Sequence, residues 1–293
     1  MSAAFAPAKI NLYLHVGPAD AEGYHPLSSW IAFADIGDRL TYEPARDRVL
    51  AVEGPFAHEL ATTGVADNLV MRAAARLLGE EGPGFQLTLH KALPVASGLG
   101  GGSSDAGAAF RLLRQVLATD VDDAELEAMA GSLGADGSAC LWARSVLAEG
   151  RGERLSPAPV APMLDAVLVN PGVVCPTGAV YRAYDEGPAA SSYRPVLPEQ
   201  FETAWDVAEA LAGCRNDLEA PAAGLRPEIA GTLDLLRAQP ETLLARLSGS
   251  GATCFALAAD PEDAERLAAA VAAAEPDWWV RTCRLGAPAP VAP

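Results

Sequence analysis

Residues 94–110 read PVASGLGGGSSDAGAAF. Four glycines crowd positions 98–102, although each costs roughly 0.5–1 kcal/mol of backbone order relative to alanine. An alternating strand is predicted at 85–91, just before the loop, and a helix at 103–118, just after it. A strand, a glycine loop and a helix in this order are typical of phosphate binding. The loop lets backbone N–H groups converge on an anion, and the helix start adds about half a positive charge.

Two familiar phosphate loops do not fit this stretch. A P-loop needs a Lys-Ser/Thr pair after its second glycine, and no lysine is present here. The dinucleotide fingerprint GxGxxG matches Gly98 and Gly100, but its third glycine is replaced by Ser103, which disfavours a dinucleotide oxidoreductase. A flexible turn before a serine-capped helix is the minor alternative. Ser103 and Ser104 offer hydroxyl donors, and Ser104 is the candidate metal ligand, the other ligands being unknown.

Composition restricts the function classes. The chain has 293 residues, which suits two domains, and a net charge of −17, which disfavours nucleic-acid binding. Its five cysteines form no CxxC pair and its four histidines show no metal-ligand spacing. No apolar run approaches the roughly 20 residues of a membrane span, and the N-terminus does not look like a signal peptide. We therefore expect a cytoplasmic protein with reduced thiols and no membrane partner.

The pattern of predicted elements is α+β. The best candidate boundary is the proline-rich run 155–163, so we expect domains at 1–157 and 158–285 and a disordered tail at 286–293. Asp67 is the expected N-cap of the first helix. Strands are predicted at 9–17, 28–36, 39–44, 85–91, 165–172, 252–260 and 278–285, and helices at 67–81, 103–118, 122–135, 198–213, 227–239 and 261–274.

The fuller loop GLGGGSSDA, residues 98–106, strongly resembles the ATP-phosphate loop of the GHMP kinases. Further segments match that family in the expected order: APAKINLYLHV at 6–16, EGYH at 22–25, DNLV at 67–70, LGAD at 133–136, GRGE at 150–153, NDLE at 216–219 and LSGSGATCFAL at 247–257. The resemblance spans nearly the whole chain. It implies an N-terminal ATP-binding and catalytic domain like domain 2 of ribosomal protein S5. It also implies a C-terminal ferredoxin-like α/β sandwich, with the active site in the cleft between the two.

The same resemblance implies a reaction. The matching branch of the family uses ATP and Mg²⁺ to phosphorylate the 2-hydroxyl of 4-diphosphocytidyl-2-C-methyl-D-erythritol, in the non-mevalonate isoprenoid pathway. The partner is then a small cytidyl diphosphate substrate, and we expect a monomer or a weak dimer. The alternatives are another GHMP kinase acting on homoserine, mevalonate or a sugar, and a catalytically silent nucleotide-binding protein.

The catalytic residues follow from the matching motifs. Asp136 takes the position of the family's base, where a carboxylate after a helix can point into a cleft. Lys9 is its expected partner, because a lysine on an apolar strand is costly to bury without a carboxylate or phosphate nearby. Asn11 shares its face of the strand and can bind a substrate hydroxyl or phosphate. Asp105 is the rival base, but a carboxylate in the first turn of a helix is usually structural.

The resemblance also assigns the binding residues. Tyr24 and His25 would bind the pyrimidine, Tyr181 would stack on it from the opposite side, and Thr177 would contact the substrate. The turn Gly249–Gly251 would line the cleft. The predicted ATP site comprises Asn68 near the adenine together with Pro94, Ser97, Gly98, Leu99, Gly100, Gly101, Gly102, Ser103 and Ser104.

One segment departs from the family pattern. After LGAD the family continues with a Val-Pro-Phe-Phe-like run and a Gly-Gly pair, whereas this chain reads GSACLWAR over 137–144. Ala143 and Arg144 stand where the glycine pair is expected. The local backbone beside Asp136 is therefore in question.

Overall fold

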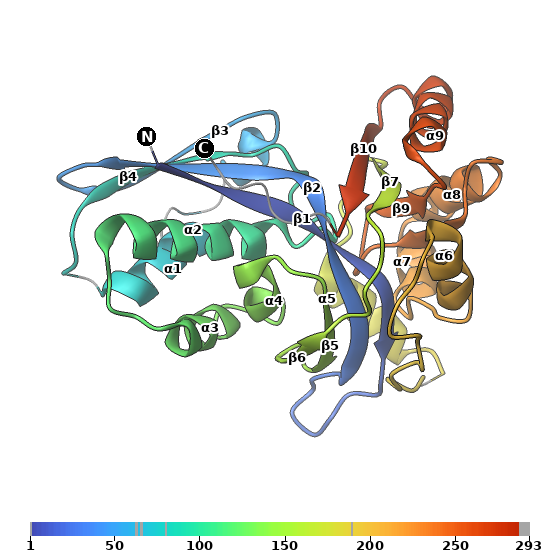
Figure 1. The fold of residues 1–293 in the computed structure, drawn as a ribbon, viewed down its shortest axis with the longest axis horizontal. Helices are drawn as coiled ribbons and strands as arrows, with labels where there is room; N and C mark the ends of the chain where they lie inside the picture. The colour runs from blue at the N-terminus through green and yellow to red at the C-terminus, as the bar shows by residue number, and fades with distance from the viewer. Residues whose placement is uncertain (1, 62–63, 65–66, 80, 189, 287–293) are drawn as a thin grey trace.

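The computed structural model describes residues 2–61, 64, 67–79, 81–188 and 190–286. It is a mixed α+β molecule, as predicted, in which the N-terminal and C-terminal halves lie side by side (Figure 1). Its strands are β1 (Ser2–Val16), β2 (Leu27–Pro44), β3 (Arg48–Glu53), β4 (Phe85–His90), β5 (Val146–Gly150), β6 (Arg154–Pro157), β7 (Leu164–Asn170), β8 (Leu244–Leu247), β9 (Cys254–Leu257) and β10 (Trp279–Leu285).

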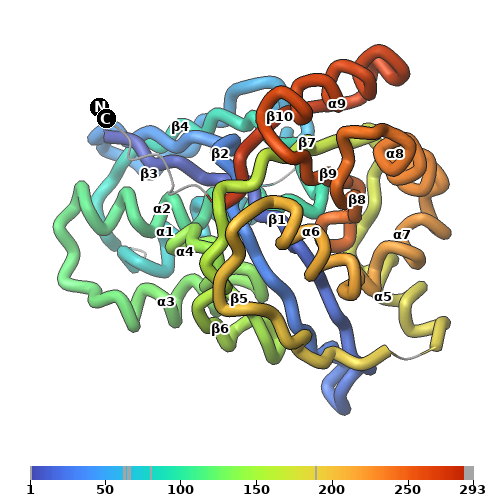
Figure 2. Tube along the Cα trace, turned by 45° about the vertical axis from the view of Figure 1, so that its right-hand side comes forward, coloured from blue at the N-terminus to red at the C-terminus, as the bar shows by residue number. Residues whose placement is uncertain are grey.

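Helices cover the faces of the sheet in both halves, so that helices α1–α4 gather beside the first strands and α5–α9 beside the last (Figures 1 and 2). They are α1 (Leu69–Leu78), α2 (Gly101–Leu117), α3 (Asp123–Gly131), α4 (Gly137–Trp142), α5 (Thr177–Asp185), α6 (Ala204–Ala212), α7 (Glu219–Leu225), α8 (Pro227–Arg237) and α9 (Pro261–Ala274), with a short 3₁₀ turn at Ala57–Leu60. Within the described residues, none of these helices is long and apolar enough to cross a membrane.

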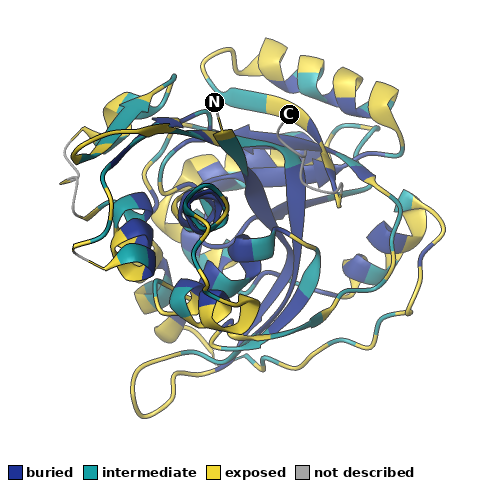
Figure 3. Cartoon of the chain, turned by 60° about the vertical axis from the view of Figure 1, so that its left-hand side comes forward, coloured by how far each residue is buried: buried dark blue, intermediate teal, exposed yellow. Residues whose placement is uncertain are grey.

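The long antiparallel pair β1–β2 organises the sheet. β2 pairs with β1, β4 and β5 and meets β10 at Leu285–Ala34, and the path β3-β4-β2-β10-β7-β9-β8 crosses both halves. The apolar alternation of Ile10, Leu12 and Leu14 accounts for one buried face of β1. The other face, with Lys9, Asn11 and Tyr13, is buried as well. Figure 3 shows the strands and inner helix faces buried and the outer faces of the helices exposed.

A central core cluster contains residues from both sides of the predicted boundary at 157/158. Ile10 and Trp30 from the first half pack there with Leu168 and Phe255 from the second. Two further clusters lie under α1 and α2 and under α5, α8 and α9. The cleft between the halves is therefore framed by elements that share one apolar centre.

Several predicted elements differ from the observed ones. Two predicted strands at 28–36 and 39–44 are one strand, β2, and the helix predicted at 198–213 begins only at Ala204, where Thr203 and Asp206 form a capping box. The N-cap of α1 is Asn68, not Asp67, because its side chain accepts from the Val70 amide at 2.9 Å. Strands β3, β5, β6 and β8 and helices α4, α5 and α7 were not predicted. The predicted disordered tail lies outside the described residues apart from Gly286.

Candidate active site

Lys9, in the middle of β1, lies beside Asp136 at the start of α4. Lys9 is only 4% exposed, and its Nζ lies 3.2 Å from Asp136 Oδ2 and donates to Asn11 Oδ1 at 2.8 Å. Asn11 Nδ2 in turn donates to Ser29 Oγ at 2.8 Å on β2. Asn11 Oδ1 and Asp136 Oδ2 therefore hold the Lys9 ammonium in place. Asp136 lies at the start of α4, and its side chain is 36% exposed.

The glycine loop lies directly against this pair. Lys9 N donates to Leu99 O at 2.8 Å, and a Cβ on Gly100 would come within 2.9 Å of Lys9 Cε. Gly100 has φ +62° and is the N-cap of α2, a left-handed conformation that glycine adopts without penalty. The first turn of α2 therefore begins beside the Lys9 ammonium, so that free N–H groups and a cation converge on one space.

The loop is also fixed from the C-terminal half. Ser248 Oγ donates to Gly98 O at 3.0 Å, and Thr253 N donates to Ser97 O at 3.0 Å. At Gly98 φ is +81°, and a Cβ there would lie 2.2 Å from Ser248 O. Close approach of two backbones, one from each half, is thus what requires glycine at this position.

Replacing Gly98 by alanine is expected to push the loop away from Ser248 and to weaken binding of an ATP analogue by roughly tenfold, which is about 1.4 kcal/mol. Titration calorimetry with a non-hydrolysable analogue measures this directly. Gly213→Ala is the matched control, because nothing lies within 4 Å of the added Cβ and its φ is −78°. Equal analogue affinity in the two variants would contradict the assignment of Gly98 to the phosphate loop.

A cavity of about 560 Å³ joins these groups. The N-terminal half supplies the glycine loop, Lys9 and Asp136, and the C-terminal half supplies the opposite wall. The predicted site residues on its lining are Lys9, Asn11, Ser97, Gly98, Gly100, Gly101, Gly102, Ser103, Asp136, Thr177 and Tyr181, together with Gly249 and Ser250 of the second glycine turn.

Four predicted ATP-site residues do not line this cavity. Pro94 borders a neighbouring cavity, and Leu99 is fully buried in the central core. Ser104 is also fully buried, so the structure places the candidate metal ligand beneath the loop and not on the lining of the cavity. Asn68 uses its side-chain oxygen to cap α1, although its neighbour Leu69 lines the cavity.

The buried ionic cluster Lys91–Asp38–Asp105 lies under the start of α2. Lys91 Nζ contacts Asp38 Oδ2 and lies 3.0 Å from Asp105 Oδ2, and all three side chains are almost fully buried. Burial raises the pKa of Asp105 to about 7, against the opposing effect of Lys91. Asp105 thus faces Lys91 and is not on the lining of the cavity.

On the opposite wall, α5 presents Thr177 and Tyr181. Thr177 Oγ1 lies 2.8 Å from Ser250 Oγ, and the Tyr181 ring packs 5.0 Å from the His25 ring. Burial, reinforced by the Asp136 charge, raises the pKa of Tyr181 to about 12, so its hydroxyl stays neutral. His25 Nδ1 donates to Gly17 O at 2.9 Å, and its Nε2 faces Asp185 Oδ1 at 3.4 Å.

Tyr24 does not join Tyr181 in the cavity. It is 55% exposed, and the Arg151 guanidinium carbon lies 4.1 Å from its ring centroid. The structure therefore brings one of the two predicted aromatic walls to the cavity and places the other on the loop outside it.

Sequence reasoning missed the polar residues that support the site from a distance. Ser29 and Ser248 hold Asn11 and Gly98, as described, and Asn216 Nδ2 donates to both Leu247 O and Gly249 O at 2.8 Å. Asn216 belongs to the NDLE motif at 216–219, whose pattern predicts no role for it. Its side chain fixes the second glycine turn, which a spacing pattern alone could not indicate.

The departure at residues 137–144 leaves the position of Asp136 intact. The segment forms α4, which starts directly after Asp136 and ends at Trp142. Ala143 follows as its C-cap, with φ +51°. Alanine thus adopts the left-handed conformation that the expected glycine pair would favour, at a cost of roughly 1–2 kcal/mol.

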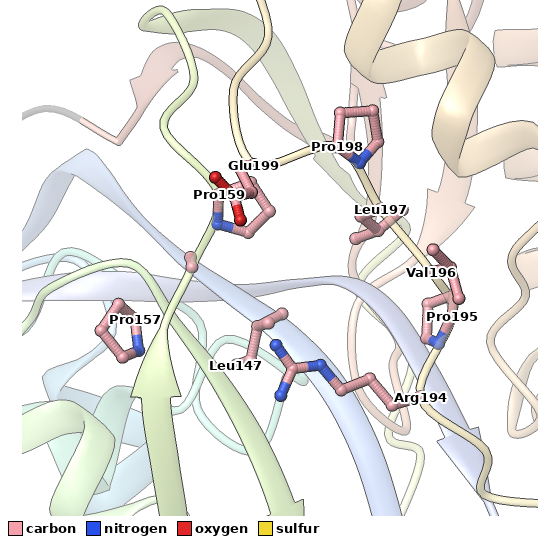
Figure 4. Close-up of a pocket in the computed structure, with 10 residues that line it drawn as sticks. Leu147, Pro157, Pro159, Arg194, Pro195, Val196, Leu197, Pro198 and Glu199 are labelled. Carbon is pink, nitrogen blue, oxygen red and sulfur yellow. The ribbon is translucent and has the colours of Figure 1, made fainter.

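A second cavity, of about 440 Å³, lies between the 157–159 segment and the 194–199 loop. Figure 4 shows its proline-rich walls, with the Arg194 side chain extending toward Leu147. None of the predicted site residues lines it.

Known proteins resemble the chain over its whole length. The GHMP kinases N terminal domain matches residues 68–144, and the GHMP kinases C terminal domain matches residues 196–277. The 4-diphosphocytidyl-2-C-methyl-D-erythritol kinase of Caulobacter vibrioides (strain NA1000 / CB15N) is 57% identical over 96% of this chain and 98% of its own length. That of Cereibacter sphaeroides (strain ATCC 17029 / ATH 2.4.9) is 48% identical over 97% and 99%.

Solved structures agree. A crystal structure of 4-(cytidine 5'-diphospho)-2C-methyl-D-erythritol kinase superposes with a TM-score of 0.76 at 35% identity, covering 98% of this chain and 100% of that one. Homoserine kinase from Cytophaga hutchinsonii shares the fold, with a TM-score of 0.67 at 19% identity over 96% and 94% of the two chains. The predicted two-domain fold is therefore confirmed, and the chain belongs to the GHMP kinases, in the family of 4-diphosphocytidyl-2-C-methyl-D-erythritol kinases.

Proposed function

We infer that this chain transfers the γ-phosphate of ATP to the 2-hydroxyl of 4-diphosphocytidyl-2-C-methyl-D-erythritol, a step of the non-mevalonate isoprenoid pathway. The observation that carries this is one cavity with a glycine loop and the Lys9–Asp136 pair on one wall and Tyr181 on the other. The 57% sequence identity to the Caulobacter vibrioides kinase, over 96% of this chain, supports the same substrate. The chain is an ATP-dependent small-molecule kinase.

In the proposed mechanism Asp136 accepts the proton of the attacking hydroxyl. Phosphoryl transfer needs positioning and charge neutralisation above all. Lys9, held by Asn11, keeps its ammonium beside the carboxylate and next to the loop, where it can steady both the attacking oxygen and the transferred phosphate. The N–H groups at the start of α2 bind the phosphate oxygens, and Ser103 adds a hydroxyl on the cavity wall. The Ser97 hydroxyl instead donates to Pro94 O at 2.7 Å within the loop.

The site also fits Mg²⁺ brought in by ATP. Among the residues that the structure describes, no three His, Cys, Asp or Glu side chains gather into a metal-binding group. Mg²⁺ typically keeps several waters and binds one or two carboxylates plus the substrate phosphates. The Ser103 hydroxyl lines the cavity and would serve as a protein oxygen for the ion, with the ATP phosphates and waters supplying the other ligands. When bound, the ion would neutralise charge on the phosphates.

We also propose a boundary between two domains at 157/158. The proline-rich connection between β6 and β7 supports it. The protein is proposed to act as a monomer or weak dimer on a small cytidyl substrate.

A coupled assay that follows ADP release tests the function. The cytidyl substrate should support turnover, whereas homoserine and mevalonate, the substrates of kinases that share only the fold, should not. Turnover with either of the latter at a higher kcat/KM would replace the proposed substrate by the broader alternative.

Tyr181→Ala is expected to raise the KM for the cytidyl substrate roughly ten- to a hundredfold, because stacking on a base is worth about 1–3 kcal/mol. The KM for ATP should barely change, since the loop lies on the other wall of the cavity. Tyr181→Phe is the control and should be nearly silent, because the ring does the stacking. Cytidine monophosphate should compete with the substrate; if it fails to compete and Tyr181→Ala has a wild-type KM, the base site lies elsewhere.

A further inference from the structure

A separate cavity, of about 460 Å³, lies between the end of α6, the 214–219 segment, α8 and β8. It shares no lining residue with the active-site cavity. Its charged lining residues are three arginines, Arg215, Arg237 and Arg246, and one carboxylate, Glu219. The whole chain carries a net charge of −17, so this lining is opposite in sign to the rest of the molecule. A cavity of this size and charge favours a small anionic ligand.

Arg246 is the most deeply buried of the three arginines, with 6% of its surface exposed. Its Nη1 donates to Leu12 O at 2.6 Å, and its Nη2 donates to Leu211 O at 3.0 Å and to Cys214 O at 2.8 Å. These carbonyls take three of the five N–H groups of the guanidinium, and none of them carries a full negative charge. Burial lowers the pKa of Arg246 below its ordinary value, with Glu219 acting in the opposite direction. A bound anion would therefore stabilise this cation.

The other two arginines are held in place by carboxylates. Arg237 Nη2 lies 2.6 Å from Glu219 Oε1, and Arg215 Nε contacts Asp217 Oδ1. Glu219 Oε2 accepts from Leu247 N at 3.0 Å, so both oxygens of this carboxylate are used within the protein. The side chains of Arg237 and Arg215 remain 48% and 36% exposed. Each arginine therefore combines a fixed position with donors that solvent, or a ligand, can reach.

We propose that this cavity is a second binding site, which takes a small phosphorylated anion between Arg215, Arg237 and Arg246. Guanidinium groups match the geometry of phosphate oxygens and bind them through paired N–H groups. The positive charges on the lining exceed the negative ones by two, which is the charge of a phosphate dianion. The inference does not depend on the substrate proposed above.

The proposed anion site lies behind two segments of the active-site cavity. Asn216 lines the anion site and donates to Gly249 O of the second glycine turn, and Arg246 binds the carbonyl of Leu12, next to Asn11. The anion site therefore uses residues that support the active-site wall from outside, and its occupation leaves the active-site cavity free. An anion should accordingly bind while an ATP analogue is present.

Titration calorimetry with inorganic phosphate and with glycerol 3-phosphate tests the proposal, on protein saturated with a non-hydrolysable ATP analogue. We expect one saturable binding event, weakened about tenfold by Arg237→Met, since hydrogen bonds to charged groups contribute more than neutral ones. Arg266→Met is the matched control, because it removes an exposed, ion-paired arginine of α9 that does not line the cavity. Tighter binding of glycerol 3-phosphate identifies a phosphate monoester as the ligand, and equal affinities identify free phosphate.

Arg215→Met provides an independent variant on the other side of the cavity and should weaken the same binding event. Arg237→Lys, which keeps the cation but loses the planar fork, should recover part of the affinity lost in Arg237→Met. Circular dichroism of each variant checks that the fold is retained. The proposal is overturned if neither probe binds saturably in the millimolar range, or if Arg237→Met and Arg215→Met bind phosphate as tightly as Arg266→Met.

Discussion

Asp136→Asn is expected to lower kcat by at least about 10²-fold, the usual loss when a general base is removed. The amide keeps the size and polarity of the side chain but cannot accept the proton of the substrate hydroxyl. ATP binding should remain, because the loop contacts that hold the phosphates do not involve Asp136. Single-turnover kinetics at saturating ATP and substrate measure the effect on the chemical step itself.

The matched control is Asp105→Asn. Asp105 is buried against Lys91 and has a pKa raised to about 7 by burial, so an amide resembles its protonated form. Turnover should therefore fall much less than in Asp136→Asn. If Asp105→Asn were the variant that lost activity while Asp136→Asn kept a wild-type rate, the two carboxylates would have to exchange roles.

Lys91→Met should lower the free energy of unfolding by about 3–5 kcal/mol, the cost of breaking a buried ion pair by removing one partner. The change would leave Asp38 and Asp105 buried side by side with no cation between them. Asp38 accepts hydrogen bonds from the Ala92 and Leu93 amides, but these N–H groups carry no positive charge to replace that of Lys91. Denaturant unfolding followed by circular dichroism measures the difference.

Two comparisons make this second prediction specific. Asp105→Asn should cost clearly less than Lys91→Met, because it leaves the Lys91–Asp38 pair intact. Arg48→Met, which removes a half-buried cation that donates to Gly79 O and Pro83 O and has no carboxylate partner among the described residues, should also cost less. An effect below about 1 kcal/mol for Lys91→Met would show that the cluster Lys91–Asp38–Asp105 does not stabilise the fold.

The parts of the site that could be predicted depend on residues that are close together in the sequence. A glycine run between a strand and a helix has few uses, so the phosphate loop was identifiable from residues 98–104. Lys9 and Asn11 share one face of an alternating strand, which predicted that they would lie together. The α+β class followed from the same periodicities, and the family resemblance supplied the partnership with Asp136 that spacing alone could not.

The parts that could not be predicted depend on contacts between distant segments. Ser248 reaches Gly98 across 150 residues, and Arg151 reaches Tyr24 from a different hairpin. Asp67 and Asn68 are both good N-caps, so only the hydrogen bond to Val70 N separates them. Helix α5, which carries Thr177 and Tyr181, could not be predicted, because nine residues are too few to show a clear helical periodicity of apolar side chains.

The position of β10 between β2 and β7 determines when the sheet can be completed during synthesis. This strand is the last one made, yet it lies between β2 and β7, pairing with β7 along Trp279–Leu285 and meeting β2 at Ala34. Before β10 is made, β7 lacks the neighbour that pairs with it along Trp279–Leu285, and an open strand edge invites pairing with other chains. The connection from β2 to β7 forms only once β10 has been made, so premature termination near residue 278 should yield a product that aggregates.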